Sequence, residues 1–303
     1  MVRQGFGLER EWTMRSDGRF DTAAIKANGL MEQKEPDLFS VRVRIVGGRV
    51  EAEHLAALAQ IARSLGSGHI HLTTRQGLEI PNVHLHNVER LRAALADVGM
   101  EFSTAGPRVR TITACQGGSC IHGLIDPQGL ARKIDALVAG RSGLPHKFKI
   151  GIAGCPNACT KPIENDLGIM GVAGKTLRDD LCNRCGACVQ ACKAPGALEI
   201  CGDRLVCHEN VCTQCGGCVA ACPFDAWELS GAMYAVFVGG KMGKRPRLAD
   251  RLPRDVNGEE NLLRTVERTI DWYAQNGERG ERFGSTLDRI GLASLADCLG
   301  SAL

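Results

Sequence analysis

The residues with the clearest chemistry are Cys115 and Cys120 and, about forty residues later, Cys155 and Cys159, called here the four-cysteine set. Four thiolates at this spacing can hold an iron–sulfur cluster. Residues 147–152 lie just before the second pair, and their alternation predicts a strand with two lysines on one face. Cluster ligands and cations therefore arrive on adjacent pieces of chain, which suggests a redox site for an anion.

Eight further cysteines form an internal repeat within about 55 residues. The first run is Cys182, Cys185, Cys188 and Cys192, and the second run is Cys212, Cys215, Cys218 and Cys222. The repeat resembles a bacterial two-cluster ferredoxin, in which the fourth cysteine of each run binds the other cluster. By that rule Cys222 completes the first cluster and Cys192 the second, although the proline after Cys192 is displaced to Pro195. Zinc held by paired CxxC motifs is the structural alternative.

The composition supports a globular protein whose cysteines serve metals. The chain has 303 residues, 44% of them apolar, and 15 cysteines, of which Cys201, Cys207 and Cys298 remain for packing. Such cysteine use suits a reducing compartment. A net charge of +3 and only three Trp, two Tyr and eight Phe give no basis for nucleic-acid binding. Residues 1–38 are too polar for a signal peptide and no apolar stretch could span a membrane, so we expect a cytoplasmic protein.

The first third of the chain predicts an α+β two-layer unit. We expect strands over 39–46 and 69–73, a short strand ending at Pro81, and helices over 55–65 and 87–98. This order is typical of a sheet covered by helices on one face only. The other face would carry Arg42, Arg44, His69, His71 and Arg75. So many cations on one face predict an anionic partner, with a solvated surface as the alternative.

The four-cysteine set follows two further predicted strands. Residues 108–114 would lead into Cys115 and residues 147–152 into Cys155, with a helix over 127–139 between them. Gly117 and Gly118 would let the backbone approach a cluster closely. Beyond the repeat we expect a strand over 235–238, a basic run and a helix over 259–275. The basic run consists of Lys241, Lys244, Arg245, Arg247 and Arg251.

Taken together, these motifs resemble the siroheme-dependent sulfite and nitrite reductase family, most closely the branch of anaerobic sulfite reductase C subunits, which carry a ferredoxin insertion. The resemblance runs from about residue 37. It rests on the order of six motifs: Arg42-Val43-Arg44 before Gly47-Gly48, Thr73-Thr74-Arg75-Gln76, Arg110 before Cys115, Lys147-Phe148-Lys149, Gly154 to Cys159, and Gly239-Gly240-Lys241. It implies a ferredoxin-like α/β half domain over 1–106, a siroheme and 4Fe-4S domain over 107–175 and 231–303, and an inserted two-cluster ferredoxin domain over 176–230.

The resemblance also implies roles for individual residues. The four-cysteine set would hold a 4Fe-4S cluster and Cys159 would also ligate the siroheme iron, although Cys115 and Cys120 lie one residue closer than is usual in the family. The siroheme carboxylates would meet Arg75, Asn157, Lys241, Lys244, Arg245 and Arg247. The anion would meet Arg42, Arg110, Lys147 and Lys149, with Arg44 as the alternative to Arg42. The two lysines would be the proton donors, because lysine can give up a proton and arginine supplies mainly charge.

The implied reaction is the six-electron reduction of sulfite to sulfide, with siroheme and three 4Fe-4S clusters as cofactors. Nitrite reduction to ammonia is the alternative at the same cofactor, and an electron-transfer subunit without siroheme is the alternative of another class. No nicotinamide motif is present, so a ferredoxin or flavoprotein subunit would donate electrons near residues 176–230. We expect a homodimer or a hetero-oligomer. In a two-fold dimer, the anion-binding residues of one chain would face the siroheme of the other.

Overall fold

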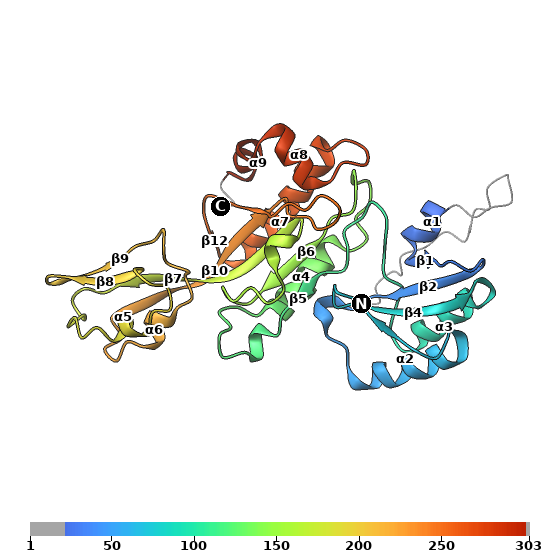
Figure 1. The fold of residues 1–303 in the computed structure, drawn as a ribbon, viewed down its shortest axis with the longest axis horizontal. Helices are drawn as coiled ribbons and strands as arrows, with labels where there is room; N and C mark the ends of the chain where they lie inside the picture. The colour runs from blue at the N-terminus through green and yellow to red at the C-terminus, as the bar shows by residue number, and fades with distance from the viewer. Residues whose placement is uncertain (1–21, 301–303) are drawn as a thin grey trace. The chain divides into compact units, whose positions relative to one another are not determined.

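The computed structural model describes residues 22–300, which divide into two compact units (Figure 1). The first unit contains the described residues up to Ile45 together with Val50–Arg108, and the second contains Val46–Arg49 and the chain from Val109 onward. Residues 1–21 of the predicted half domain, and residues 301–303 at the end of the predicted siroheme domain, lie outside the described residues.

The first unit is one antiparallel sheet with helices packed against it. The strand order is β1 (Leu30–Glu32), β2 (Leu38–Val43), β4 (Leu78–His84) and β3 (His71–Leu72). The helices are α1 (Thr22–Ala27), α2 (Ala52–Leu65), η2 (Leu85–Asn87) and α3 (Val88–Asp97). In β2 the burial alternates, with Phe39, Val41 and Val43 in the core and Arg42 on the opposite face. The helices α2 and α3 thus form where the sequence predicted them, and β2 forms but ends at Val43, three residues before its predicted end.

Two other strands of the first unit also differ from the prediction. The strand expected over 69–73 is only β3, and Leu72 is 72% exposed, so it buries no apolar face. The strand expected to end at Pro81 continues to His84. A β-bulge explains this, because Pro81 and Asn82 together oppose one residue of β2, and Asn82 takes a left-handed φ of 56°. A bulge removes the ladder hydrogen bond that proline cannot donate.

The second unit is built on a six-stranded mixed sheet. Its strands are β11 (Asp250–Arg251), β10 (Trp227–Val238), β7 (Leu167–Leu177), β6 (Ile150–Ala153) and β5 (Thr113–Ala114) in that order, with β12 (Val256–Asn257) also paired to β10. The strands β5, β6 and β7 are parallel, and β10 is antiparallel to β7. The helices are η1 (Val46–Gly48), η3 (Gly117–Ser119), α4 (Pro127–Val138), η4 (Pro162–Glu164), α7 (Glu259–Asn276), α8 (Phe283–Ile290) and α9 (Leu292–Leu299).

Local chemistry explains why α4 forms where the sequence predicted it. Asp126 caps the helix by accepting hydrogen bonds from the backbone N–H groups of Gln128 and Gly129, and Pro127 occupies the first turn. Leu130, Ala131, Ile134 and Val138 form its buried stripe. The helix α7 extends one residue beyond its predicted end, to Asn276.

The sheet of the second unit differs from the prediction at three strands. The strand expected over 108–114 is reduced to β5, and Val109 keeps only an isolated bridge to Phe148. The strand expected over 147–152 begins at Ile150, so both lysines precede it. The strand expected over 235–238 is the end of the longer β10, whose partner β7 was not predicted. Most of β7 is buried on both faces, and such a strand shows no polar alternation.

The cysteine repeat lies between β7 and β10, which stay paired as far as Leu177 and Trp227 (Figure 1). It contains α5 (Ala187–Ala191), α6 (Gly217–Ala220) and the hairpin of β8 (Leu198–Cys201) and β9 (Arg204–Cys207). Arg184 and Gln214 share a left-handed φ of 54–60°, and Gly186 and Gly216 share a φ of 75–80°. The repeat in sequence is therefore a repeat in backbone conformation.

Candidate active site

The four-cysteine set lies at the carboxyl ends of two parallel strands. Cys115 follows β5 directly, and Cys155 follows β6 after one glycine. Burial raises the pKa of the Cys155 thiol, and the other three thiols of the set raise that pKa further. The structure therefore brings all four predicted ligands within electrostatic reach of one another, Cys120 included.

Backbone groups hold these thiols closely. The N–H of Gly154 donates a 3.0 Å hydrogen bond to the sulfur of Cys115, and the N–H of Asn157 bonds the sulfur of Cys155. A Cβ on Gly154 would lie 2.9 Å from the Cα of Gly117 and 3.4 Å from the Cys115 sulfur. Glycine is required at this close approach. Hydrogen bonds to sulfur are one of the means by which proteins tune iron–sulfur clusters, so the donor set fits a cluster.

Cys159 differs from its sequence neighbour Cys155 because it is presented at the surface, as Cys120 also is. The preceding residue, Ala158, has a φ of 51°, a left-handed conformation that costs energy for a residue other than glycine. Cys159 and Asn157 are both exposed, whereas Cys155 is buried. A thiolate at this position can bind a cluster on one side and still reach a second group.

Three of the four predicted anion-binding residues lie at the other, amino ends of the same strands. Lys147 and Lys149 precede β6, and the N–H of Arg110 donates to the carbonyl of Phe148 at 2.8 Å. His146 joins them, because its pKa is lowered by burial and then by the charges of Lys147, Arg282 and Arg110. This end of the sheet is therefore a cluster of cations that also includes Arg282, which sequence analysis missed.

A buried carboxylate supports this cluster. Asp166 is fully buried, and both of its oxygens accept hydrogen bonds of 2.8 Å from Nη2 of Arg282. One of the same oxygens accepts the backbone N–H of Lys149 at 2.9 Å. Burial raises the pKa of Asp166, and the Arg282 guanidinium opposes that rise. Asp166 lies just before β7. Because β7 was not predicted from the sequence, the role of Asp166 was not predicted either.

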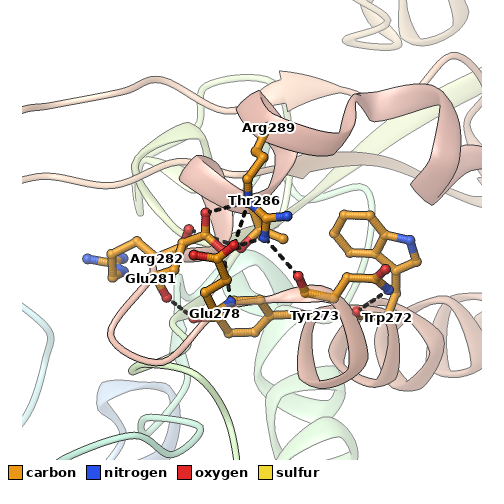
Figure 2. Close-up of polar contacts among 8 residues, drawn as sticks. Trp272, Tyr273, Glu278, Glu281, Arg282, Thr286 and Arg289 are labelled. Carbon is orange, nitrogen blue, oxygen red and sulfur yellow. Dashed lines mark hydrogen bonds and ion pairs between the residues drawn. The ribbon is translucent and has the colours of Figure 1, made fainter.

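A second polar cluster fixes the loop that carries Arg282 (Figure 2). Glu281 accepts hydrogen bonds from Nη2 of Arg289 at 2.7 Å, the hydroxyl of Thr286 at 3.0 Å and the N–H of Glu278 at 2.9 Å. The bond from Arg289 is the main reason that the pKa of Glu281 falls to about 2. The hydroxyl of Tyr273 donates to the Glu281 carbonyl at 2.6 Å.

The first unit places its predicted cations beside carboxylates. Nε of Arg42 lies 2.7 Å from Oε1 of Glu79, its cross-strand partner on β4, and Nε of Arg44 lies 3.1 Å from Oε1 of Glu101. His69 and His71 are exposed, and Arg75 is half-buried. The sheet face that the sequence described as cationic therefore also carries Glu79, a residue that only the pairing of β2 with β4 brings there.

The basic run after β10 contains residues that are hydrogen-bonded to the protein and residues that are exposed. Nζ of Lys241 donates to the hydroxyl of Ser285 at 2.9 Å. Arg247 bonds Asp288 at 2.9 Å, Asp250 at 2.6 Å and two backbone carbonyls. Lys244 and Arg245 are exposed between them. The structure thus shows that Arg247 holds the loop in place, and that Lys244 and Arg245 are exposed to solvent.

One pocket in the cysteine repeat, open to solvent, is lined by residues of both runs. Its cysteines are Cys182, Cys185, Cys188 and Cys222, the set that the ferredoxin resemblance assigns to one cluster. The apolar side chains of Ile200, Leu205, Phe224 and Trp227 complete the lining. No group of three or more His, Cys, Asp or Glu side chains within residues 22–300 is placed to hold a single metal ion.

The second run packs beside the four-cysteine set. The N–H of Ala173 donates to the carbonyl of Gln214 at 2.8 Å, and a Cβ on Gly216 would lie 3.5 Å from the side chain of Leu124. Leu124 in turn donates its N–H to the carbonyl of Gly154 at 2.9 Å. One loop therefore contacts both the second run and the four-cysteine set.

Family comparison agrees with this geometry. Residues 105–303 match the nitrite and sulphite reductase 4Fe-4S domain, and residues 31–98 match the nitrite/sulfite reductase ferredoxin-like half domain. The chain belongs to the nitrite and sulphite reductase family. The predicted family and its α+β fold class are confirmed.

Several relatives in this family carry sulfite reductase names. The chain is 40% identical to the C subunit of the anaerobic sulfite reductase of Salmonella typhimurium over 69% of its own length and 66% of that protein. It is 34% identical to the coenzyme F420-dependent sulfite reductase of Methanocaldococcus jannaschii, over 84% of its length and 41% of that protein. More distant relatives include the assimilatory ferredoxin-dependent nitrite reductase of Haloferax mediterranei, at 28% identity over 84% of this chain and 38% of that protein.

Solved structures of the family share the fold. Dissimilatory sulfite reductase I matches with a TM-score of 0.70 over 87% of this chain and 69% of that one, at 19% identity. Mycobacterium tuberculosis NirA matches with a TM-score of 0.68 over 93% of this chain and 47% of that one, at 18% identity. Among residues 22–300, no helix has the length and apolar character needed to cross a bilayer.

Proposed function

We propose that this chain is the siroheme-binding part of a sulfite reductase that reduces sulfite to sulfide. The observation that carries the proposal is the four-cysteine set, which presents Cys159 at the surface of a sheet whose other end gathers cations. Family membership supports an oxidoreductase, and relatives over most of the chain carry sulfite reductase names. A pure electron carrier would need the cysteines but not the cations.

The chain's own residues would bind the anion and supply protons. When bound, siroheme coupled to a 4Fe-4S cluster held by the four-cysteine set would supply the electrons for the reduction. Lys147, Lys149 and Arg110 would hold the oxyanion by charge, with Arg42 as the fourth cation, and the two lysines would protonate the leaving oxygens. Asp166 would keep Lys149 in place through the backbone bond of 2.9 Å.

We further propose that a complete site is shared between two chains. Lys149 immediately precedes the four-residue strand β6 and Cys155 follows it after one glycine, so the strand alone separates them by roughly 13 Å at about 3.3 Å per residue. Because β5 and β6 are parallel, the cations gather at the amino ends of these strands and the thiols at their carboxyl ends. A two-fold dimer would bring the cations of one chain to the siroheme held by Cys159 of the other.

The proposed electron route has three stages within the chain. Electrons from a ferredoxin or a flavoprotein subunit would enter a 4Fe-4S cluster in the cavity of Cys182, Cys185, Cys188 and Cys222. They would pass to a second cluster held by Cys212, Cys215, Cys218 and Cys192, and then to the four-cysteine set. The closeness of Gly216 to Leu124 supports this order, because Leu124 also donates a backbone hydrogen bond to Gly154, next to that set. This route assumes the ferredoxin domain proposed over residues 176–230.

The siroheme carboxylates would meet the exposed cations Lys244 and Arg245, together with Lys241, Arg75 and Asn157. Arg247 would act indirectly, since Asp250, Asp288 and two carbonyls already occupy its guanidinium. The visible spectrum of a Lys244→Ala, Arg245→Ala double variant would test this assignment. It should show reduced siroheme content with the iron–sulfur signals intact.

Anaerobic turnover with reduced viologen tests the function itself. We expect siroheme absorption in the purified protein and sulfide production from sulfite. Nitrite is the second candidate substrate, because nitrite reductases are among the relatives. Faster ammonia production from nitrite than sulfide production from sulfite would favour that alternative. Iron–sulfur signals without siroheme absorption would instead identify an electron-transfer subunit.

Mixed dimers test the shared site. A Lys149→Met chain is expected to keep only a small residual turnover alone, and a Cys159→Ser chain none. Co-expression should restore one intact site in each mixed dimer, and therefore part of the wild-type turnover. Two sites each confined to one chain would give no recovery.

A further inference from the structure

Lys175 stands apart from the cysteine motifs but touches one of them. It lies on β7 opposite Leu229 of β10, and its Nζ donates a 3.2 Å hydrogen bond to the sulfur of Cys212. The ammonium also lies 5.8 Å from the ring centroid of Trp227. Lys175 is half-buried, so solvent screens its charge less than that of a surface lysine.

The two runs are not equivalent in this respect. Cys212 is the first cysteine of the second run, and Cys182 is its counterpart in the first run. The neighbouring cation in the first run is Arg184, which donates to the backbone carbonyl of Cys182 and pairs with Asp179 at 2.8 Å. The repeat therefore has closely similar backbone conformation in both halves, and each cation lies near the first cysteine of its run. The charge of Arg184 is paired with the Asp179 carboxylate, whereas the ammonium of Lys175 meets the Cys212 sulfur and the Trp227 ring.

A cation at a ligand sulfur has a definite electrochemical consequence. Reduction adds one negative charge to a cluster, and a nearby positive charge stabilises that reduced form. Hydrogen bonds to the sulfurs, net charge and exposure are the features that set cluster potentials. An ammonium 3.2 Å from a ligand sulfur combines the charge with the hydrogen bond.

We propose that Lys175 raises the reduction potential of the second-run cluster above that of the first-run cluster. The inference rests on the proposed function, since it requires clusters in both runs. The step it controls moves one electron from the first-run cluster to the second-run cluster, with no bond made or broken and no proton moved. Electrons would then collect on the cluster that lies beside the four-cysteine set.

The test is a redox titration of the anaerobic holoprotein followed by electron paramagnetic resonance. In Lys175→Met, the ratio of reduced to oxidised second-run cluster at a fixed potential should fall about tenfold, which corresponds to about 59 mV for one electron. The other cluster signals should keep their midpoints. Lys175→Arg should retain most of the wild-type ratio, because it keeps a cationic donor.

Two further variants separate charge from other effects. Lys133→Met removes an exposed ammonium on α4 and is the matched control, expected to leave every midpoint unchanged. Lys175→Gln can keep an N–H donor but loses the charge, so it should shift the ratio in the same direction as Lys175→Met. It also provides the measurement if the methionine variant fails to assemble.

Three results would overturn the inference. These are unchanged midpoints in the methionine and glutamine variants, a shift in the glutamine variant opposite to the expected one, and an equal shift in Lys133→Met. Iron content and resonance spectra of the wild-type protein report separately on the proposed function. Fewer than two cluster signals beyond the siroheme-coupled cluster would reject the clusters themselves, and with them the role of Lys175.

Discussion

The two ends of strands β5 and β6 are built in opposite ways. At the carboxyl end, thiols are held by backbone N–H groups, and Gly154 lets two loops approach closely. At the amino end, charged side chains are held by other charged side chains, with the buried pair of Asp166 and Arg282 at the centre. A cluster needs soft ligands and little space, whereas an anion site needs fixed cations. One pair of strands can serve both because its ends are far apart.

Removing a thiol at the carboxyl ends of β5 and β6 should have the largest effect on cofactor content and on turnover. We expect Cys155→Ser to lose the siroheme-coupled cluster and all sulfite reduction, since a buried ligand of the set is removed. Iron analysis and resonance spectra should show the loss of one cluster while the ferredoxin-type signals remain. Cys298→Ser, at an exposed cysteine of α9, is the control and should behave as wild type. A fully loaded Cys155→Ser protein would remove this residue from the ligand set.

Removing a cation at the amino ends of β5 and β6 should impair turnover without loss of cofactors. Lys149→Met is expected to lower kcat about 10²- to 10³-fold, because one cation and one proton donor disappear from the anion site. Siroheme absorption should be retained, which distinguishes this variant from those at the carboxyl end. Wild-type turnover with sulfite would place proton delivery elsewhere. Lys133→Met supplies the matched control, because that lysine is exposed on α4 and pairs with Glu259.

The supporting carboxylate of the amino end can be tested through stability. Asp166→Asn should lower the free energy of unfolding by about 3–5 kcal/mol, because it leaves the Arg282 guanidinium without its buried counter-charge. Urea denaturation measures this. The double variant Asp166→Asn, Arg282→Gln should lose less than the sum of the single losses. Asp297→Asn, an exposed control, should change stability by less than about 0.5 kcal/mol. Additive losses would mean that the two residues act independently.

The smallest expected effect concerns the loop that carries Arg282. Glu281 is only 15% exposed, and its pKa falls from the usual 4.5 to about 2, mainly because Arg289 donates to it. A lowered pKa stabilises the folded state above pH 4.5, and the contribution disappears as the pH falls towards 2. We expect Glu281→Gln to cost about 1–2 kcal/mol at pH 7, a value reduced because Arg289 is partly exposed.

Thermal unfolding at several pH values checks this last prediction. The difference between wild type and Glu281→Gln should be full at pH 7 and shrink steadily between pH 4.5 and pH 2. Glu260→Gln is a suitable control, because Glu260 is 87% exposed and its nearest cation, Arg264, is 3.8 Å away. A difference that stays constant down to pH 2 would show that the carboxylate charge does not act at this loop.

Local patterns in the sequence were enough to predict the cysteine groups and several of the helices and strands. The spacing of the cysteines indicated three groups, and the alternation from Phe39 to Val43 predicted β2. The cap and the apolar stripe of α4 lie within a dozen residues, so that helix could also be predicted. Such features depend on neighbours along the chain, and the sequence contains them directly. The family motifs belong to the same class, because each is a short run of residues.

The tertiary structure alone decided which distant residues meet. Glu79 reaches Arg42 only through strand pairing, Asp166 meets Arg282 across 116 positions, and Lys175 meets Cys212 across 37. No local pattern marks these partners. The pair of Glu79 and Arg42 depends on the register of β2 and β4, and the other two pairs depend on β7, a strand without polar alternation. The parallel direction of β5 and β6 also separates the cations from the thiols that stand close to them in sequence. Strand direction is a property of the fold, so the sequence showed the two groups as neighbours and the structure placed them at opposite ends.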